Sequence, residues 1–176
     1  MHRFKVIYCT VLIVVVLFVS SCNKEDISDD AARLRVKLTD ASTLVLREFH
    51  IEIDGIEVFA TDSVNIEGEW VPLEYSGGEY SLLTLMNGKT VQIVDQYFPA
   101  EKSIEKIRIN FGNNNRMITV TDSIIQLRKY PQIADGVVID NLEVELAPHI
   151  ITSIIIDINA ALSIREHDGE WFLNPA

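Results

Sequence analysis

The chain is poor in cysteine. Its 176 residues include two, Cys9 and Cys22, and both lie near the N-terminus. The part that follows Cys22 therefore offers no thiol for a disulfide, a zinc site or a nucleophile. This scarcity excludes disulfide-stapled scaffolds and thiol-dependent enzymes as classes for that part of the chain.

Basic residues are also few compared with acidic ones. Fifteen Lys and Arg stand against 26 Asp and Glu, which gives a formal net charge of -11. An acidic surface repels phosphate groups, so the sequence predicts no nucleic-acid partner and no electrostatic contact with anionic lipid. The plain consequence of such acidity is solubility.

The longest apolar stretch, residues 6–19, is too short for an ordinary membrane-spanning helix, which needs about 20 apolar residues. Arg3 and Lys5 precede it, and the small residues Ser20 and Ser21 follow it. This order is typical of a signal peptide. We therefore expect residues 1–21 to be removed, which would bring the charge from -11 to near -13 because two cations and no acid leave. A transmembrane anchor is the alternative.

The segment Val19-Ser20-Ser21-Cys22 resembles the lipobox of bacterial lipoproteins. The resemblance implies cleavage before Cys22 and acylation of that cysteine, which would hold the protein to the membrane through its acyl chains. It predicts an outer-membrane lipoprotein, on the cell surface or on the periplasmic face. Residues 22–32 then form an acidic, flexible tether. The tether also resembles the surface-export signal of Bacteroidetes lipoproteins, and a plain solvated spacer is the alternative.

No long segment shows a helical period, and from Arg33 onward apolar residues alternate with polar ones. Alternation with a period of two is typical of strands that bury one face. It runs through residues 34–38, 49–53, 107–111 and 142–146, with turn signals rich in Gly and Asn between them. Residues 33–176 are therefore expected to form one all-β domain, an antiparallel β-sandwich of Ig-like or prealbumin-like Greek-key type. A closed barrel is the alternative.

Two details of this pattern make sharper predictions. The apolar phase changes at Gly55, which indicates a bulge or bend in that strand. Residues 154–158 form a denser apolar run, which indicates a central strand covered on both faces. One helical turn is expected around residues 80–86.

Several segments along the domain resemble an uncharacterised family, domain of unknown function 4382, whose members are exported, often lipid-anchored and common in Bacteroidetes. The resemblance rests on the order and spacing of residues 33–41, 80–83, 87–88, 98–100, 107–109, 156–164 and 171–175. This sequence departs from the family pattern at Ser42, where family members often have proline. The resemblance implies a β-sandwich-like extracytoplasmic domain and implies no activity.

The sequence shows no constellation typical of an enzyme. Its histidines beyond the leader stand alone, and there is no nucleophile elbow or phosphate-binding loop. Carboxylates are paired on strand faces, at Glu52 with Asp54 and at Glu143 with Glu145. Such pairs can hydrolyse glycosides when a cleft fixes their separation, so a carboxylate-dependent envelope hydrolase is the alternative function. The prediction is a non-enzyme, with no catalytic residue, metal or cofactor.

Four residues are candidate sites of other kinds. Asp40 follows the first strand and Asp157 lies in the apolar run, so each could ligate calcium weakly or cap backbone amides in a turn. Ser63 and Ser123 lie in Asp-Ser-aliphatic tripeptides that resemble the O-glycosylation sequon of Bacteroidetes secreted proteins. The aromatic residues are expected in the core or at strand edges rather than in a sugar-binding platform.

These observations favour a lipid-anchored, non-catalytic binding or structural module of the cell envelope. Its ligand would be a glycan, a peptide or a partner in a surface assembly. A further possibility is a subunit whose exposed strand edge receives another chain.

Overall fold

The computed structural model describes residues 30–40, 45–62 and 67–175. Strands dominate it, and the two helical turns in this part are short 3-10 helices, so the all-β prediction is confirmed. In chain order the elements are β1 (Ala32–Thr39), β2 (Glu48–Asp62), β3 (Glu69–Pro72), β4 (Gly78–Ser81), η1 (Leu82–Leu85), β5 (Val91–Phe98), β6 (Lys102–Phe111), β7 (Asn115–Ile118), β8 (Ile124–Lys129), η2 (Pro131–Ile133), β9 (Val137–Ile139), β10 (Val144–Glu145), β11 (Ile151–Asp157), β12 (Ile164–His167) and β13 (Glu170–Leu173). None of the helices described is long and apolar enough to cross a membrane.

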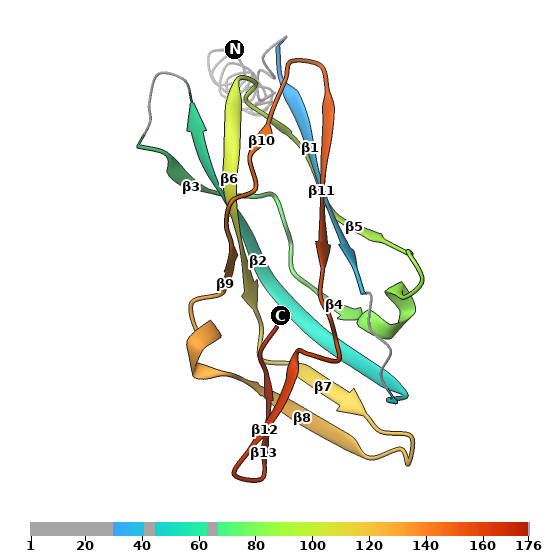
Figure 1. The fold of residues 1–176 in the computed structure, drawn as a ribbon. Coiled ribbons are helices and arrows are strands. Elements are labelled where there is room, and N and C mark those ends of the chain that lie inside the picture. Colours follow the sequence, from blue (N-terminus) through green and yellow to red (C-terminus); the bar gives the residue numbers. More distant parts are fainter. Residues whose placement is uncertain (1–29, 41–44, 63–66, 176) are drawn as a thin grey trace, which may run out of the picture.

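The strands form two sheets that enclose one hydrophobic core (Figure 1). The smaller sheet has the order β11-β1-β5. The larger has ten strands, with β10-β6-β2-β7-β8-β13-β12 as its main path and β3, β4 and β9 paired to β2 or β6. The inward residues of β1 and β2 are fully buried, among them Leu34, Val36 and Ile51.

The prediction of antiparallel sheets is wrong in two places. β1 pairs with β11 in parallel, and β13 pairs with β8 in parallel, whereas the other pairings are antiparallel. Alternation reports only which face of a strand is buried, and it carries no information on the direction of the neighbouring strand. More than a hundred residues separate β1 from β11, so only the tertiary structure sets this pairing.

The prediction of a central, doubly covered strand at residues 154–158 is also wrong. β11 is an edge strand of the smaller sheet, and its residues alternate between buried and exposed. Ile154 and Ile156 enter the core, whereas Ile155 is 58% exposed. A run of isoleucines is compatible with a strand buried on both faces and equally with a strand that exposes isoleucines on its outer face, so the sequence pattern does not distinguish the two.

Two local predictions are confirmed. The register of β2 against β6 shifts between Ile53 and Gly55, which is the bulge expected at this glycine. Because of that shift Ile53 and Ile56 are both buried although they are three residues apart. The expected helical turn is η1, which follows β4 directly.

Candidate functional site

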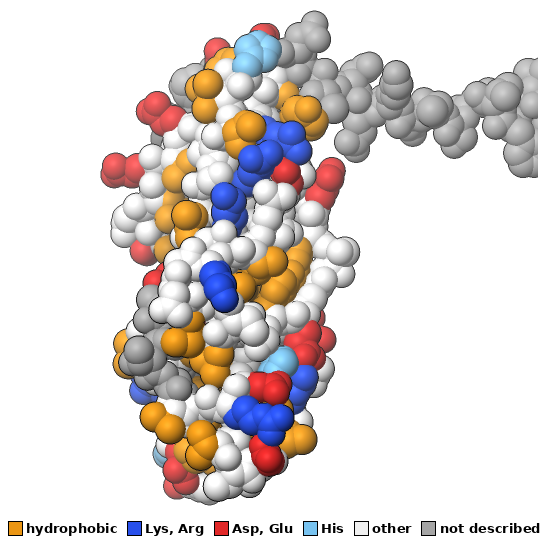
Figure 2. Space-filling view, turned by 90° about the vertical axis from the view of Figure 1, so that its right-hand side faces the viewer, with side chains coloured by type: hydrophobic (Ala, Val, Ile, Leu, Met, Phe, Trp, Pro, Cys, Tyr) orange, Lys and Arg blue, Asp and Glu red, His pale blue; other side chains and the backbone are white. Residues whose placement is uncertain are grey.

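The outer face of the smaller sheet carries a row of basic side chains. Arg33, Arg35 and Lys37 alternate along β1 with the buried residues of the core, so all three project outward. Their register partners on β11 are Ile151, Ser153 and Ile155. Figure 2 views this side of the molecule and shows Lys and Arg side chains in a row with apolar side chains beside it. We call these three cations the basic row.

Asp95 of β5 is the carboxylate that pairs with the basic row. It accepts hydrogen bonds from Nη2 of Arg33 at 2.9 Å and from Nε of Arg35 at 3.2 Å. The hydrogen bond from Arg33 is the main reason why the pKa of Asp95 lies below its ordinary value, and the guanidinium pKa is raised in turn. Within the described ranges no ion pair involves Lys37, so the row keeps an excess of positive charge.

Apolar side chains border the basic row on both sides. On β11, Ile151 is 51% and Ile155 58% exposed, and on β5, Tyr97 is 53% exposed. The guanidinium of Arg33 lies 5.8 Å from the ring centroid of Tyr97, which is cation–π distance. A chain of net charge -11 thus presents one face that is basic and apolar together. Such a face suits an anionic ligand that also has an apolar part.

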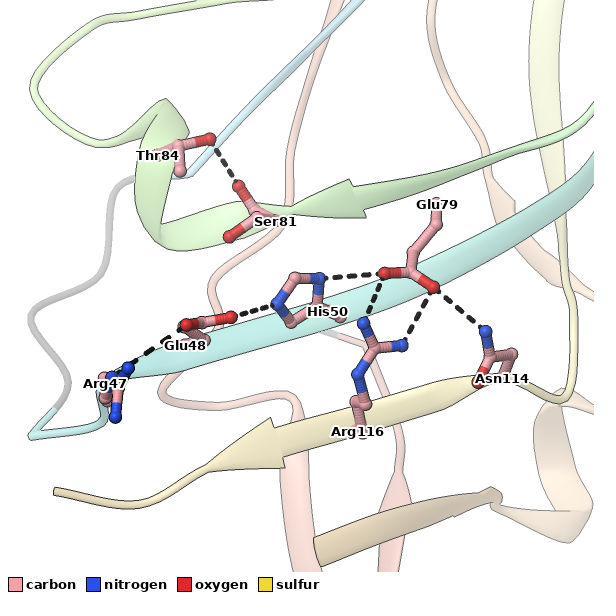
Figure 3. A network of polar contacts seen from close by, with 8 residues as sticks. All are labelled: Arg47, Glu48, His50, Glu79, Ser81, Thr84, Asn114 and Arg116. Atoms are coloured by element: carbon pink, nitrogen blue, oxygen red, sulfur yellow. Dashed lines mark hydrogen bonds and ion pairs between the residues drawn. The ribbon is translucent and has the colours of Figure 1, made fainter. Parts of the chain in front are cut away.

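A second polar cluster lies on the outer face of the larger sheet (Figure 3). His50 of β2 has Glu48 2.7 Å from Nε2 and Glu79 3.0 Å from Nδ1. Arg116 of β7 donates to both oxygens of Glu79, at 2.6 and 2.8 Å, and Asn114 donates to the same carboxylate at 2.9 Å.

The charges of this cluster satisfy one another. The hydrogen bonds from Arg116 hold the pKa of Glu79 below its ordinary value, and the pKa of Arg116 is raised. Glu79 therefore stays ionised. It lies on β4 and links this strand to β7 across β2, which pairs with both. The cluster fits a structural cross-link better than acid chemistry, since a general acid needs a raised carboxyl pKa.

The two candidate aspartates lie at the same end of the small sheet but in different surroundings. Asp40 follows β1 and is 1% exposed, and its Oδ1 accepts a hydrogen bond from the backbone N–H of Ala160 at 3.2 Å. This is the amide-capping geometry, because the carboxylate joins the end of β1 to the turn after β11. Asp157 is exposed at the end of β11, opposite Thr39. No group of three or more His, Cys, Asp and Glu in the described part of the chain is arranged to hold a metal.

The two carboxylate pairs of the alternative hydrolase lie in different parts of the larger sheet. Glu52 and Asp54 are both on β2, and Glu145 is on β10. The carboxylate of Glu52 accepts a hydrogen bond from the backbone N–H of Asn114 at 2.8 Å, and Asp54 is exposed on the same strand. Glu145 lines a surface hollow with Glu101 and Lys102 at the β6–β10 end. Glu79 and Asp95 are the described carboxylates with a shifted pKa, and both shifts are downward, the opposite of what a general acid needs.

Of the modification sites, Ser123 is exposed in the turn between β7 and β8, and its N–H donates to Oγ1 of Thr119 at 3.1 Å. Ser63 and the acylation candidate Cys22 lie outside the described residues. Within the described ranges the ring contacts form two separate pairs rather than one platform. Trp70 packs edge-on against Phe59 with ring centroids 5.5 Å apart, and burial and a hydrogen bond to Tyr80 raise the pKa of Tyr75.

Sequence reasoning used Arg33, Arg35 and Lys37 only as the polar half of a strand pattern. The feature that could have identified them is their shared sign, since three cations at a period of two must lie on one face. Their apolar neighbours on β11 could not be found in this way, because the β1–β11 pairing joins distant parts of the sequence.

The fold and this face define an all-β domain of two mixed sheets with a basic, apolar-bordered outer surface. Residues 31–175 match the family model of a domain of unknown function, DUF4382, and the chain belongs to that family. No curated protein and no solved structure shows significant similarity to the chain.

Proposed function

We propose that this protein is a lipid-anchored, non-catalytic binding module of the cell envelope, and that its ligand lies on the outer face of the smaller sheet. The observation that carries the proposal is the basic row of Arg33, Arg35 and Lys37, bordered by exposed isoleucines on a strongly acidic protein. Rows of like charge with low-dielectric borders attract ligands of opposite charge. The ligand chemistry that fits is a carboxylate-bearing chain, either an acidic glycan or an acidic peptide.

The anchor is the second part of the proposal. Acylation at Cys22 would place the start of β1, ten residues further on, within about 35 Å of the membrane surface. The domain would then act at the outer membrane, on the cell surface or on its periplasmic face. An Ig-like or prealbumin-like Greek key is the finer fold that we propose for it, supported by two sheets around one core.

A binding experiment tests the surface. Polygalacturonate and polyglutamate serve as carboxylate-bearing probes, with neutral dextran for comparison, and calorimetry measures the affinity at two salt concentrations. The test variant replaces the whole basic row by glutamine. Since exposed charge pairs contribute about 0.2–1 kcal/mol each, loss of three predicts about 3- to 150-fold weaker binding.

The matched control replaces three cations elsewhere, Lys106, Arg128 and Arg165, by glutamine, so that net charge changes equally. We expect this control to bind like the wild type. Binding that is unaffected by the basic-row variant, or equally weakened by the control, would contradict the proposed surface. Whichever of the two anionic probes binds more tightly distinguishes a glycan from a peptide.

Protease shaving of intact cells tests the location. If the domain is on the outer surface, protease removes it from intact cells, and if it is periplasmic, removal requires a broken outer membrane. Cys22→Ala is the control for the anchor, and we expect it to remain an unprocessed precursor or to leave the membrane fraction. A Cys22→Ala protein indistinguishable from wild type in processing and membrane attachment would refute the lipoprotein proposal.

A further inference from the structure

β11 has one edge that pairs with no strand in the described part of the chain. It pairs with β1 alone, and the ladder runs without a shift from Ile151 to Asp157. At its ends the carbonyl of Ile150 accepts from Arg33 at 3.0 Å, and the N–H of Ile158 donates to Thr39 at 3.1 Å. Even-numbered residues of β11 therefore direct their amides to β1.

Alternation then fixes what the other edge offers. Ile151, Ser153 and Ile155 direct their backbone N–H and C=O groups away from β1, because successive residues of a strand point to opposite sides. The side chains of the same three residues are exposed on the outer face. Natural edge strands are usually blocked by lysine, proline or a bulge, and the sequence of β11 has none of these. This edge is suited to pair with another strand.

The side chains of β11 indicate what kind of strand fits. An added strand would have its outward side chains about 5 Å from Ile151, Ser153 and Ile155. The basic row would be two strand spacings away, about 10 Å. An acidic strand would therefore lie against isoleucines rather than against arginines, whereas a strand with isoleucines and a serine at alternate positions matches the surface.

β11 itself is such a strand. An antiparallel pair of two β11 strands about a two-fold axis at Ser153 places Ile151 of each copy opposite Ile155 of the other, and serine opposite serine. Cross-strand pairs of this kind stabilise sheets. A shift by one residue would turn the isoleucines of one strand away from those of the other.

We propose that β11 is the contact site for a second copy of this chain, and that the two small sheets join there into one six-stranded sheet. The two basic rows then lie three strand spacings apart, about 14 Å, which exceeds the screening length of about 8 Å at physiological salt. Their repulsion does not oppose the contact. The proposal is independent of the ligand, and it places both basic rows on one continuous face.

The contact is small. A single pair of seven-residue strands buries less than the roughly 1,000 Å² that a stable dimer in solution needs. This contact rests on the lipid anchor proposed above, which would confine the copies to a membrane and raise their effective concentration. It is therefore to be measured on the full chain in membranes.

Cysteine cross-linking in membranes of cells expressing the full chain tests the proposal. Ser153→Cys with a short bifunctional thiol reagent is expected to shift the band to twice the monomer mass. The wild type, whose native cysteines are Cys9 and Cys22, measures the background. Ile151→Cys alone is the register control. In the proposed register each Ile151 lies opposite Ile155 of the other copy, so the two Ile151 positions are four residues apart along the strand and too distant for a short reagent. Mixed with Ile155→Cys, it is expected to cross-link.

A second substitution separates a specific contact from random collision. Ile155→Lys in the Ser153→Cys chain places a charge on the edge and is expected to abolish the shifted band, whereas Val120→Lys, at the far β7–β8 turn, is expected to leave it. Absence of a band above background in Ser153→Cys, or equal bands from Ile151→Cys alone, would overturn the proposal. A cross-link to a different protein would also overturn it, in favour of a foreign strand at this edge.

Discussion

The buried carboxylate of Asp40 gives the sharpest test of how the small sheet is held together. It accepts a hydrogen bond from the backbone N–H of Ala160 and is 1% exposed. Asp40→Ala leaves that buried amide without this acceptor. Loss of a hydrogen bond to a charged group costs about 1.5–3 kcal/mol. With a urea m-value of about 1–3 kcal/mol/M for a small domain, the unfolding midpoint should fall by about 1 M.

Two variants frame this measurement. Asp40→Asn keeps an oxygen acceptor and so a neutral hydrogen bond to the amide. It is therefore expected to lose about 1 kcal/mol less than the alanine variant, which is the typical net contribution of such a bond. Asp140→Ala removes an exposed carboxylate and is expected to change the free energy of unfolding by less than about 0.5 kcal/mol. Circular dichroism in a urea series measures all three.

The same series separates amide capping from calcium binding. If Asp40 caps the turn, EDTA and added calcium leave the wild-type midpoint unchanged. If Asp40 is a calcium ligand, EDTA lowers that midpoint and the asparagine variant is as unstable as the alanine variant. A midpoint for Asp40→Ala equal to that of Asp140→Ala would refute the reasoning from burial.

Three further predictions concern charge, backbone and modification. Because the pKa of Asp95 is lowered in the folded state, its ion pairs stabilise the fold above about pH 4, and this contribution is lost as the pH falls further. Thermal melts from pH 7 to pH 2 should therefore show a shallower acid loss for Asp95→Asn than for wild type. Gly136 and Gly88 both have positive φ, but a Cβ at Gly136 would lie 2.9 Å from the carbonyl oxygen of the neighbouring strand, whereas a Cβ at Gly88 meets nothing within 4 Å. Alanine at the first should thus lower the melting temperature more than alanine at the second, and equal losses would contradict the steric argument. If Ser123 or Ser63 carries a glycan, the intact mass of the natively made protein exceeds that of polypeptide plus acyl groups, and alanine at the modified position removes the excess.

Local patterns in the chain were enough for much of the fold. The alternation in residues 34–38 and 49–53 predicted strands with one buried face, and the structure has them in β1 and β2. The phase change at Gly55 predicted the bulge. These features depend on the spacing of apolar residues within a few positions of one another. That spacing determines which face of a strand is buried, independently of which strand pairs with it.

Features that depend on distant pairing were not accessible in this way. The apolar run in residues 154–158 predicted a covered central strand, and the structure places it at a sheet edge with Ile155 exposed. The same limitation concealed the candidate site, because the isoleucines and the basic row lie side by side only through the β1–β11 pairing.

By itself, the amino-acid sequence determined that the domain is all-β, that its surface is acidic, and that three cations share one face of the first strand. It also supports the expected lipid anchor, which rests on residues before the domain. The tertiary structure alone decided that β11 lies parallel to β1 at a sheet edge, and that Asp40 reaches the turn at Ala160. The physical reason is that side-chain periodicity records burial, whereas strand order and direction arise from contacts between residues far apart in the sequence, such as those of β1 and β11.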